Sequence, residues 1–402
     1  MNVLALRDFP ARNRAQPGKD TGIARVEIIE QVDRAEAPWR ALEQGDSLST
    51  PYQRYEFLKL WQRHVGAPAG VIPFIVVGFN GAGAPLFLWP FGRRHVGGVQ
   101  VAEFLGGKHA NFNMGVWRRD LAETIEAGEL RAVLKQLAGH ADLLRLESQP
   151  LTWNGTTNPF ALLQHRRSAN YGFSGTLIPD YDALLRAHTN SSTRKKMRKK
   201  ERALAGFGTV RFEQAQNDPE VRRVLDVFFK QKSARMRVLG VSDAFAPPRV
   251  RRFIEAAAAQ HLADGAPVIE LYALSVGDII VATFGGIVGS GRFSGMFNSI
   301  IKDRYAAESP GEQLLTQVVR RCCERGLDTF DLGIGQSNYK TLFCPDAEPL
   351  FESHLPLSPA GRLLAFGYGV AAGCKRTVKG NAPLWKLVRQ LRRLRARMSP
   401  AI

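Results

Sequence analysis

One segment in the last fifth of the chain brings together a carboxylate, a phenol and an amine. A short apolar run ends at Asp331, glycines at 333 and 335 turn the chain, and Tyr339 and Lys340 follow in a predicted helical turn. Open α/β sheets place ligands at such strand ends. There Asp331 could accept a proton from an attacking nucleophile, and Tyr339 could protonate a departing thiolate. We expect Lys340 to contact the substrate. The alternative is a capped turn with a half-buried tyrosine and a solvated lysine.

A predicted helix start precedes this segment. Ser309 as N-cap, Pro310 at the first helical position and Glu312 at the third predict a capping box. A helix N-terminus presents free N–H groups and a positive potential, which suit a pyrophosphate. The alternative is a helix start without a ligand, because the Glu312 carboxylate would use the same donors and repel an anion.

A polar loop in the first half of the chain, Gly106 to Asn113, offers acceptor-binding groups in His109, Asn111 and Asn113. The alternative is a loop that closes its own backbone hydrogen bonds. The eight histidines and four cysteines show no metal-ligand spacing, so we expect no metal site and reduced thiols.

The net charge of +18 is concentrated in two segments. Residues 194–202 contain seven Lys/Arg and one Glu, and residues 361–402 contain ten Lys/Arg and no Asp or Glu. Subtracting +6 and +10 from +18 leaves about +2 for the rest of the chain. The segment Thr193 to Arg202 has no aromatic residues between its basic ones, so nucleic acid is not a favoured partner. The exception is tRNA, which belongs to one of the alternative functions given below. A solvated basic helix is the alternative.

The C-terminal basic segment is also amphipathic. Apolar residues at 384, 387, 388, 391 and 394 form one helical stripe opposite a cationic face, so residues 384–398 could lie on an anionic membrane. The alternative is that the stripe packs on the protein itself.

The elements that must position these residues occur twice. Val71 to Trp89 and Val268 to Gly286 each predict a strand, a glycine-rich turn and a second strand. A third strand follows in each half, Val99 to Leu105 and Phe293 to Ser299. After it come an amphipathic helix, Ala122 to Ala138 or Gly311 to Arg325, and a last short strand, Asp142 to Glu147 or Leu327 to Leu332. The pattern predicts two α/β units of one design. A further helix, about Pro219 to Met236, shows a core-facing apolar stripe and no evident chemistry.

Several of these motifs together resemble a known family. The run from Phe284 to Phe343, with Ser309-Pro-Gly, Phe330-Asp-Leu-Gly-Ile-Gly and Tyr339-Lys, is similar to the C-terminal signature of CelD-like acetyltransferases. This GNAT-superfamily group is linked to cellulose and exopolysaccharide biosynthesis and is related to FemAB peptidyltransferases. The resemblance covers roughly Arg25 to Leu355.

The resemblance implies a tandem GNAT fold with acyl transfer in the second unit. It implies that acyl-CoA binds at Ser309, Pro310, Gly311 and Gln313, with Phe297, Asn298 and Ser299 beside the thioester, and it gives Tyr339 the role of general acid. The usual GNAT loop, Gln/Arg-x-x-Gly-x-Gly/Ala, is absent here, and Ser-Pro-Gly-Glu stands in its place.

We therefore expect an acyltransferase that moves an acetyl or other acyl group to an amine or hydroxyl of a sugar, polysaccharide or envelope precursor. One alternative is a FemAB-like aminoacyl or peptidyl transferase that uses charged tRNA. Another is a non-catalytic binding protein of an exopolysaccharide system.

The expected architecture is mixed α/β: two mixed sheets flanked by helices, with a basic helical tail. We assign residues 1–22 to a disordered leader, 23–170 to the first unit, 171–357 to the second unit with the transfer site, and 358–402 to the tail. The leader lacks the apolar core of a signal peptide. We expect a cytoplasmic protein that could also bind peripherally to the inner membrane.

Overall fold

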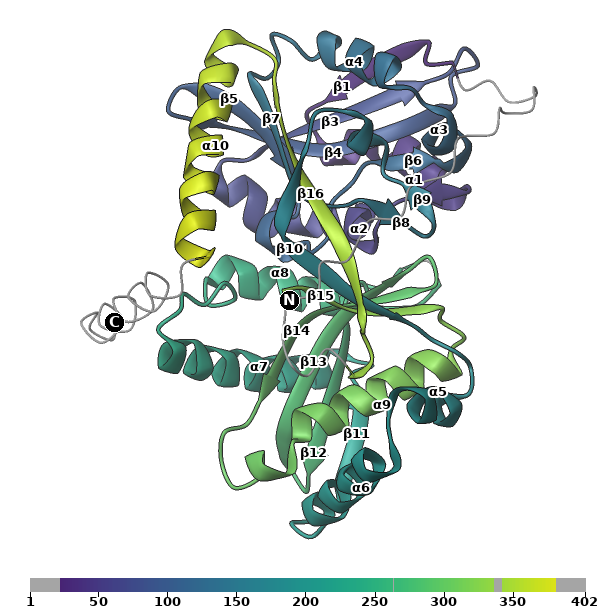
Figure 1. The fold of residues 1–402 in the computed structure, drawn as a ribbon, viewed down its shortest axis with the longest axis vertical. Helices are drawn as coiled ribbons and strands as arrows, with labels where there is room; N and C mark the ends of the chain where they lie inside the picture. Colours follow the sequence, from purple (N-terminus) through teal and green to yellow (C-terminus); the bar gives the residue numbers. More distant parts are fainter. Residues whose placement is uncertain (1–21, 263, 336–341, 381–402) are drawn as a thin grey trace.

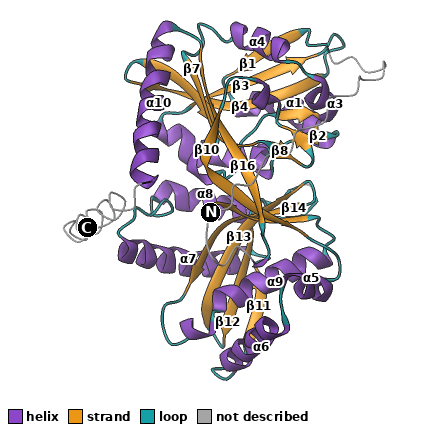
Figure 2. Ribbon diagram, in the orientation of Figure 1, coloured by secondary structure: helices purple, strands orange, loops and turns teal. Residues whose placement is uncertain are grey.

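The structure is a computed structural model that describes residues 22–262, 264–335 and 342–380. Figure 1 shows an elongated molecule with two α/β lobes, and two long strands, β10 (Arg166–Thr176) and β16 (Asp346–Pro356), cross from one lobe to the other. Helices lie on both sides of the strands in each lobe (Figure 2). We call the lobe with β1 to β7 the first unit and the lobe with β11 to β15 the second unit.

The two units repeat one topology, as the sequence predicted. In the first unit an antiparallel series, β3 (Ile72–Phe79), β4 (Pro85–Val96) and β5 (Val99–Phe104), is followed by β7 (Leu143–Pro150), which pairs in parallel with β5. In the second unit β12 (Glu270–Val276), β13 (Ile279–Gly289) and β14 (Arg292–Ile300) form the series, and β15 (Thr329–Ile334) is parallel to β14. Edge strands β1 (Arg25–Ile29) and β11 (Val210–Gln214) complete the units.

The two expected sheets are joined into one sheet of 14 strands. The join forms because β16 pairs with β7 of the first unit and with β10, and β10 in turn pairs with β15 of the second unit. The boundary predicted between residues 170 and 171 falls inside β10, and the division into domains stays a prediction.

The crossover of each unit is helical. In the second unit it is α9 (Pro310–Glu324), close to the predicted Gly311–Arg325. In the first unit the prediction of a single helix over Ala122–Ala138 is wrong. Two helices, α3 (Arg119–Thr124) and α4 (Ala127–Gln136), replace it, because Glu126 and Glu129 form a capping box that starts a new helix.

The remaining elements surround this frame. The other helices are α1 (Glu36–Gln44), α2 (Tyr55–Trp61), α5 (Tyr181–His188), α6 (Ser191–Ala205), α7 (Asp218–Leu239), α8 (Pro248–Ala259) and α10 (Pro359–Gly380). The short strands are β2 (Ser47–Leu48), β6 (Val116–Arg118), β8 (Thr152–Trp153) and β9 (Thr156–Thr157). No helix in the part of the chain that the structure describes is long and apolar enough to cross a membrane.

Two clusters of buried apolar side chains form the hydrophobic core of the protein. The larger fills the first unit and continues under α7 and α8, and the smaller lies between the second sheet and α9. Contact between the units is direct, since Phe57 of α2 packs edge-on against Phe253 of α8 with ring centroids 5.2 Å apart. This packing joins α2 of the first unit to α8.

Candidate active site

The strands β14 and β15 diverge where the site is expected. Their parallel pairing covers Arg292 to Ser294 against Thr329 to Asp331, and the strands continue beyond it to Ile300 and Ile334. A wedge therefore opens at the carboxyl ends of the strands, where α/β sheets place ligands.

A side chain from the first unit enters this wedge. Asn111 Nδ2 donates hydrogen bonds to the Gly295 carbonyl and to the Tyr52 hydroxyl, each at 3.0 Å. Gly333 lies on the other side with φ +67°, and a Cβ on it would stand 2.4 Å from Asn111 Nδ2. Gly333 is thus required both by its backbone conformation and by the approach of Asn111.

A cavity of about 760 Å³ lies between the units. Its walls come from the loop 107–113, from β4, β5 and β7, from the segment 242–250, and from Ile334. His109, Asn111 and Asn113, the three predicted acceptor-binding residues, all line it. Nothing in the structure tests whether they bind an acceptor, so that role stays a prediction.

Two of these polar side chains are withdrawn from solvent, His109 being half-buried and Asn113 buried. Trp61 Nε1 donates to His109 Nδ1 at 3.1 Å, and burial lowers the pKa of His109, so its imidazole is neutral at physiological pH. Asn113 is 6% exposed and donates to the Glu147 carbonyl at 3.2 Å, while its Oδ1 has no hydrogen-bond partner among the described residues. A buried amide oxygen of this kind is a ready acceptor for a ligand hydroxyl or amine.

Charges of both signs line the same cavity. Glu103 pairs with Arg145 at 2.6 Å and with Arg94 at 3.2 Å, and Arg145 reaches Glu147 at 3.5 Å. Burial raises the pKa of Glu147. The cavity is therefore suited to a polar ligand.

Asp331 lies in a closed ion-pair cluster. It is fully buried, accepts from Arg292 Nε at 2.7 Å and Ser294 Oγ at 2.5 Å, and also accepts from the Gly333 N–H at 2.9 Å. Arg292 also binds Glu348 through both terminal nitrogens at 2.8 and 2.7 Å. Burial raises the pKa of Asp331, against the opposing effect of Arg292. In this arrangement Asp331 anchors the start of the wedge, and its role as proton acceptor stays a prediction.

The predicted capping box at α9 is wrong. Ser309 is the N-cap residue, but its backbone is left-handed with φ 52° and its side chain makes no cap hydrogen bond. The hydroxyl instead accepts a hydrogen bond from Lys200 Nζ of α6 at 2.7 Å. The N–H groups of Glu312 and Gln313 bond to the Ser309 carbonyl, and Pro310 has no N–H, so few backbone donors remain for an anion.

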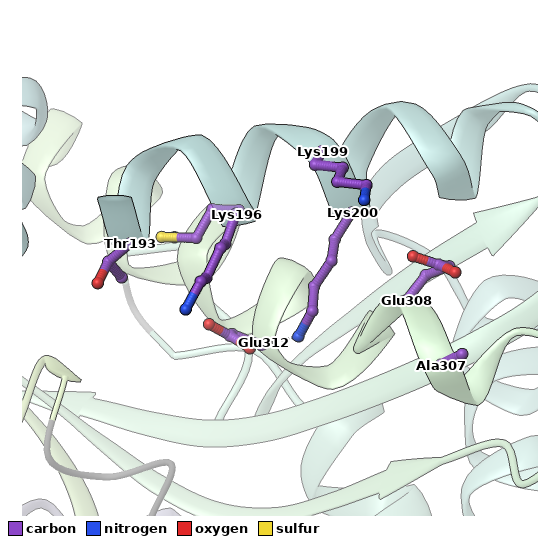
Figure 3. A pocket seen from close by; sticks show the side chains of 8 residues that line it. Thr193, Lys196, Lys199, Lys200, Ala307, Glu308 and Glu312 are labelled. Carbon is purple, nitrogen blue, oxygen red and sulfur yellow. Dashed lines mark ion pairs between the residues drawn. The ribbon is translucent and has the colours of Figure 1, made fainter. Parts of the chain in front are cut away.

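The basic helix supplies the positive charge at this helix start. A pocket of about 420 Å³ lies between α6 and α9, lined by Lys196, Lys199 and Lys200 on one side and by Glu308 and Glu312 on the other. Figure 3 shows Lys196 and Lys200 pointing from α6 toward Glu312, and Lys200 Nζ lies 3.8 Å from that carboxylate. The negative charge that would repel an anion is therefore countered by a neighbouring lysine.

The other predicted donor-site residues lie along the same strand and helix. A Cβ on Gly311 would stand 2.3 Å from Ile300 Cδ1, so the helix start packs closely on β14. Gln313 Nε2 donates to the Glu308 carbonyl at 2.9 Å. Phe297 packs on Phe228 with centroids 4.5 Å apart, and Ser299 Oγ bonds to Gln231 at 2.7 Å.

Sequence reasoning missed Lys232 on α7. Its Nζ donates to the Asn298 carbonyl at 3.3 Å, and burial lowers its pKa, with Asp243 opposing and Arg235 adding to the effect. The signal was present, because Lys232 follows Phe228 by four residues and so lies on the core-facing stripe of its helix. Tyr339 and Lys340 lie outside the described residues.

Comparison with known proteins agrees with the fold. Residues 191–341 match the acetyltransferase (GNAT) domain family. The structure is similar to that of FemX, at a TM-score of 0.56 and 10% identity over 85% of this chain and 100% of that one. It is also similar to a conserved protein of unknown function from Bacteroides thetaiotaomicron VPI-5482, at a TM-score of 0.50 and 10% identity over 82% of this chain and 100% of that one.

No protein with a curated description matches the sequence. The matched GNAT domain and the repeated topology together make the fold a tandem GNAT fold. In residues 22–262, 264–335 and 342–380 no group of three or more His, Cys, Asp or Glu side chains could hold a metal ion.

Proposed function

We propose that this protein transfers an acyl group from acyl-CoA to an amine or hydroxyl of a sugar, polysaccharide or envelope precursor. The observation that carries the proposal is the pairing of α6 with the start of α9. Lys200 bonds to Ser309 and faces Glu312, and Lys196 and Lys199 line the same pocket. The lysines would supply positive charge to a diphosphate at the place where the usual GNAT loop is absent.

The residues present fit such a donor. Its diphosphate would lie between α6 and α9, and its acyl end would follow β14 toward Asn298 and the wedge. When bound, acyl-CoA supplies a thioester whose carbonyl carbon can be attacked directly. Binding donor and acceptor side by side lowers the barrier by proximity, without a covalent enzyme intermediate.

The acceptor side of the proposal rests on the cavity between the units. Asn113 Oδ1 and the neutral His109 ring offer hydrogen-bonding groups to a hydroxyl or amine. Lys232, whose lowered pKa raises its neutral fraction, would take the proton released as the new bond forms. Tyr339 would return a proton to the departing thiolate. The resemblance to CelD-like proteins supports a saccharide acceptor.

The proposal is tested by incubating the protein with acetyl-CoA and a panel of amino sugars and sugar nucleotides. Free thiol should be released together with a product heavier by one acetyl group. The Tyr339→Phe variant should lower turnover more than donor affinity, since the hydroxyl acts in the transfer and not in binding. If charged tRNA and not acetyl-CoA binds and supplies the transferred group, the tRNA-dependent alternative replaces the proposal. If neither donor binds, the non-catalytic alternative replaces the proposal.

A further inference from the structure

Helix α10 exposes an apolar face that is not covered by any described part of the chain. Leu363, Phe366 and Val370 are 75%, 71% and 51% exposed. Their spacing of three and four residues places them on one side of the helix. Single exposed apolar residues are ordinary, but an aligned set on a helix marks an interaction surface.

The opposite side of α10 is firmly attached to the first unit. Ser358 Oγ bonds to Asp142 at 2.5 Å and caps the helix at the Gly361 N–H. A Cβ on Gly361 would stand 1.8 Å from the Asp142 carbonyl, so the helix approaches closely there. Tyr368 packs on His354 with centroids 5.6 Å apart. The outward direction of the apolar face is thus set by contacts on the inner face.

The charge of this end of the chain favours one kind of partner. Residues 361–402 carry ten Lys/Arg and no Asp or Glu, and Arg362 is exposed beside the apolar face. An apolar helix face joined to a cationic segment matches the two demands of an anionic bilayer, apolar burial and attraction to acidic headgroups. We propose that α10 docks on an anionic membrane surface through Leu363, Phe366 and Val370.

Docking there would bring the cavity between the units near the bilayer. Arg145 lines that cavity, and its guanidinium also stacks on Tyr368 of α10 at 4.9 Å from the ring centroid. Figure 1 shows α10 along the side of the first unit, continuing toward the second. A lipid-linked or membrane-embedded acceptor would then meet the cavity without leaving the membrane surface. The docking itself is independent of the proposed acyl transfer.

The test is co-sedimentation of the full chain with vesicles of phosphatidylcholine alone or mixed with phosphatidylglycerol. We expect binding to the mixed vesicles, reduced at least roughly tenfold in Leu363→Ser/Phe366→Ser, because two large apolar side chains leave the interface. Val238→Ser is the matched control, since Val238 is 84% exposed on α7. It should bind like the wild type. Replacing Arg392, Arg393, Arg395 and Arg397 by Gln should abolish the preference for anionic vesicles.

Three outcomes would overturn the proposal. The first is no binding by the wild type, and the second is unchanged binding by Leu363→Ser/Phe366→Ser. The third is a wild-type dimer that the same double substitution converts to a monomer without any vesicle binding, which would assign the face to a second copy of the chain. Because the substituted side chains are exposed, folding should be retained, and the thermal midpoint checks this.

Discussion

Asn111 of the first unit donates a hydrogen bond to the Gly295 carbonyl of β14 at 3.0 Å, in the wedge between β14 and β15. The two residues are 184 positions apart, so this contact exists only when the units are assembled. It makes the geometry of the candidate site depend on both units. The adjoining Gly333 leaves the space that the amide occupies.

A first prediction concerns this contact. Gly333→Ala should lower the free energy of unfolding by about 2–3 kcal/mol, from left-handed strain plus the contact with Asn111. Gly326→Ala is the control: Gly326 has φ +69° but open space around its missing Cβ, so only the strain of about 1 kcal/mol remains. The double variant Asn111→Ala/Gly333→Ala should lose less than the sum of the single losses in chemical denaturation. Strict additivity would show that Asn111 does not meet the added methyl group.

A second prediction concerns Lys232. Lys232→Met should lower turnover about 100-fold or more with donor affinity unchanged, if its amine takes the proton from the acceptor. The exposed neighbour Lys230 provides the control Lys230→Met. The lowered pKa of Lys232 predicts that the wild-type rate rises with pH and levels off below the ordinary lysine pKa. A variant with the wild-type rate and pH profile would remove Lys232 from the mechanism.

A third prediction concerns His354, under α10. Burial, with Arg166 and Arg145 nearby, lowers the pKa of His354 to about 4. Because the unfolded state holds the proton more tightly, stability from this group is complete above the ordinary histidine pKa of about 6.5 and is lost as pH falls toward 4.

His354→Gln should therefore reduce the loss of stability between pH 7 and pH 5 by about 1 kcal/mol, a value discounted for partial exposure. Urea midpoints at the two pH values measure this change. The half-buried His109 also has a lowered pKa and contributes in the same direction, so only the difference between variant and wild type is diagnostic. An equal loss in both proteins would contradict the assignment.

The repeated strand and helix pattern predicted the two units because it is carried by local hydrophobic periodicity. Long-range pairings carry no such signal: Lys200 and Ser309 are 109 residues apart, and their bond replaced the predicted capping box. The same holds for β10 and β16, whose pairing fuses the two expected sheets. Lys232 was within reach of sequence reasoning, as a lysine on an otherwise apolar stripe. The burial of Asp331 could not be predicted from the sequence, because it depends on Arg292 and Glu348 from other strands.

Calorimetric titration with acetyl-CoA tests most directly whether α6 and the start of α9 together hold an acyl-CoA donor. Wild-type protein should bind at micromolar concentration. Lys200→Gln should weaken binding about tenfold or more by removing a charge-assisted bond to phosphate. Adding Glu312→Gln should restore part of the loss, because the uncompensated carboxylate is removed. Lys195→Gln, the same charge change on α6 away from the pocket, should have little effect. Absence of acetyl-CoA binding by the wild type, or equal affinity in Lys200→Gln, would contradict the account.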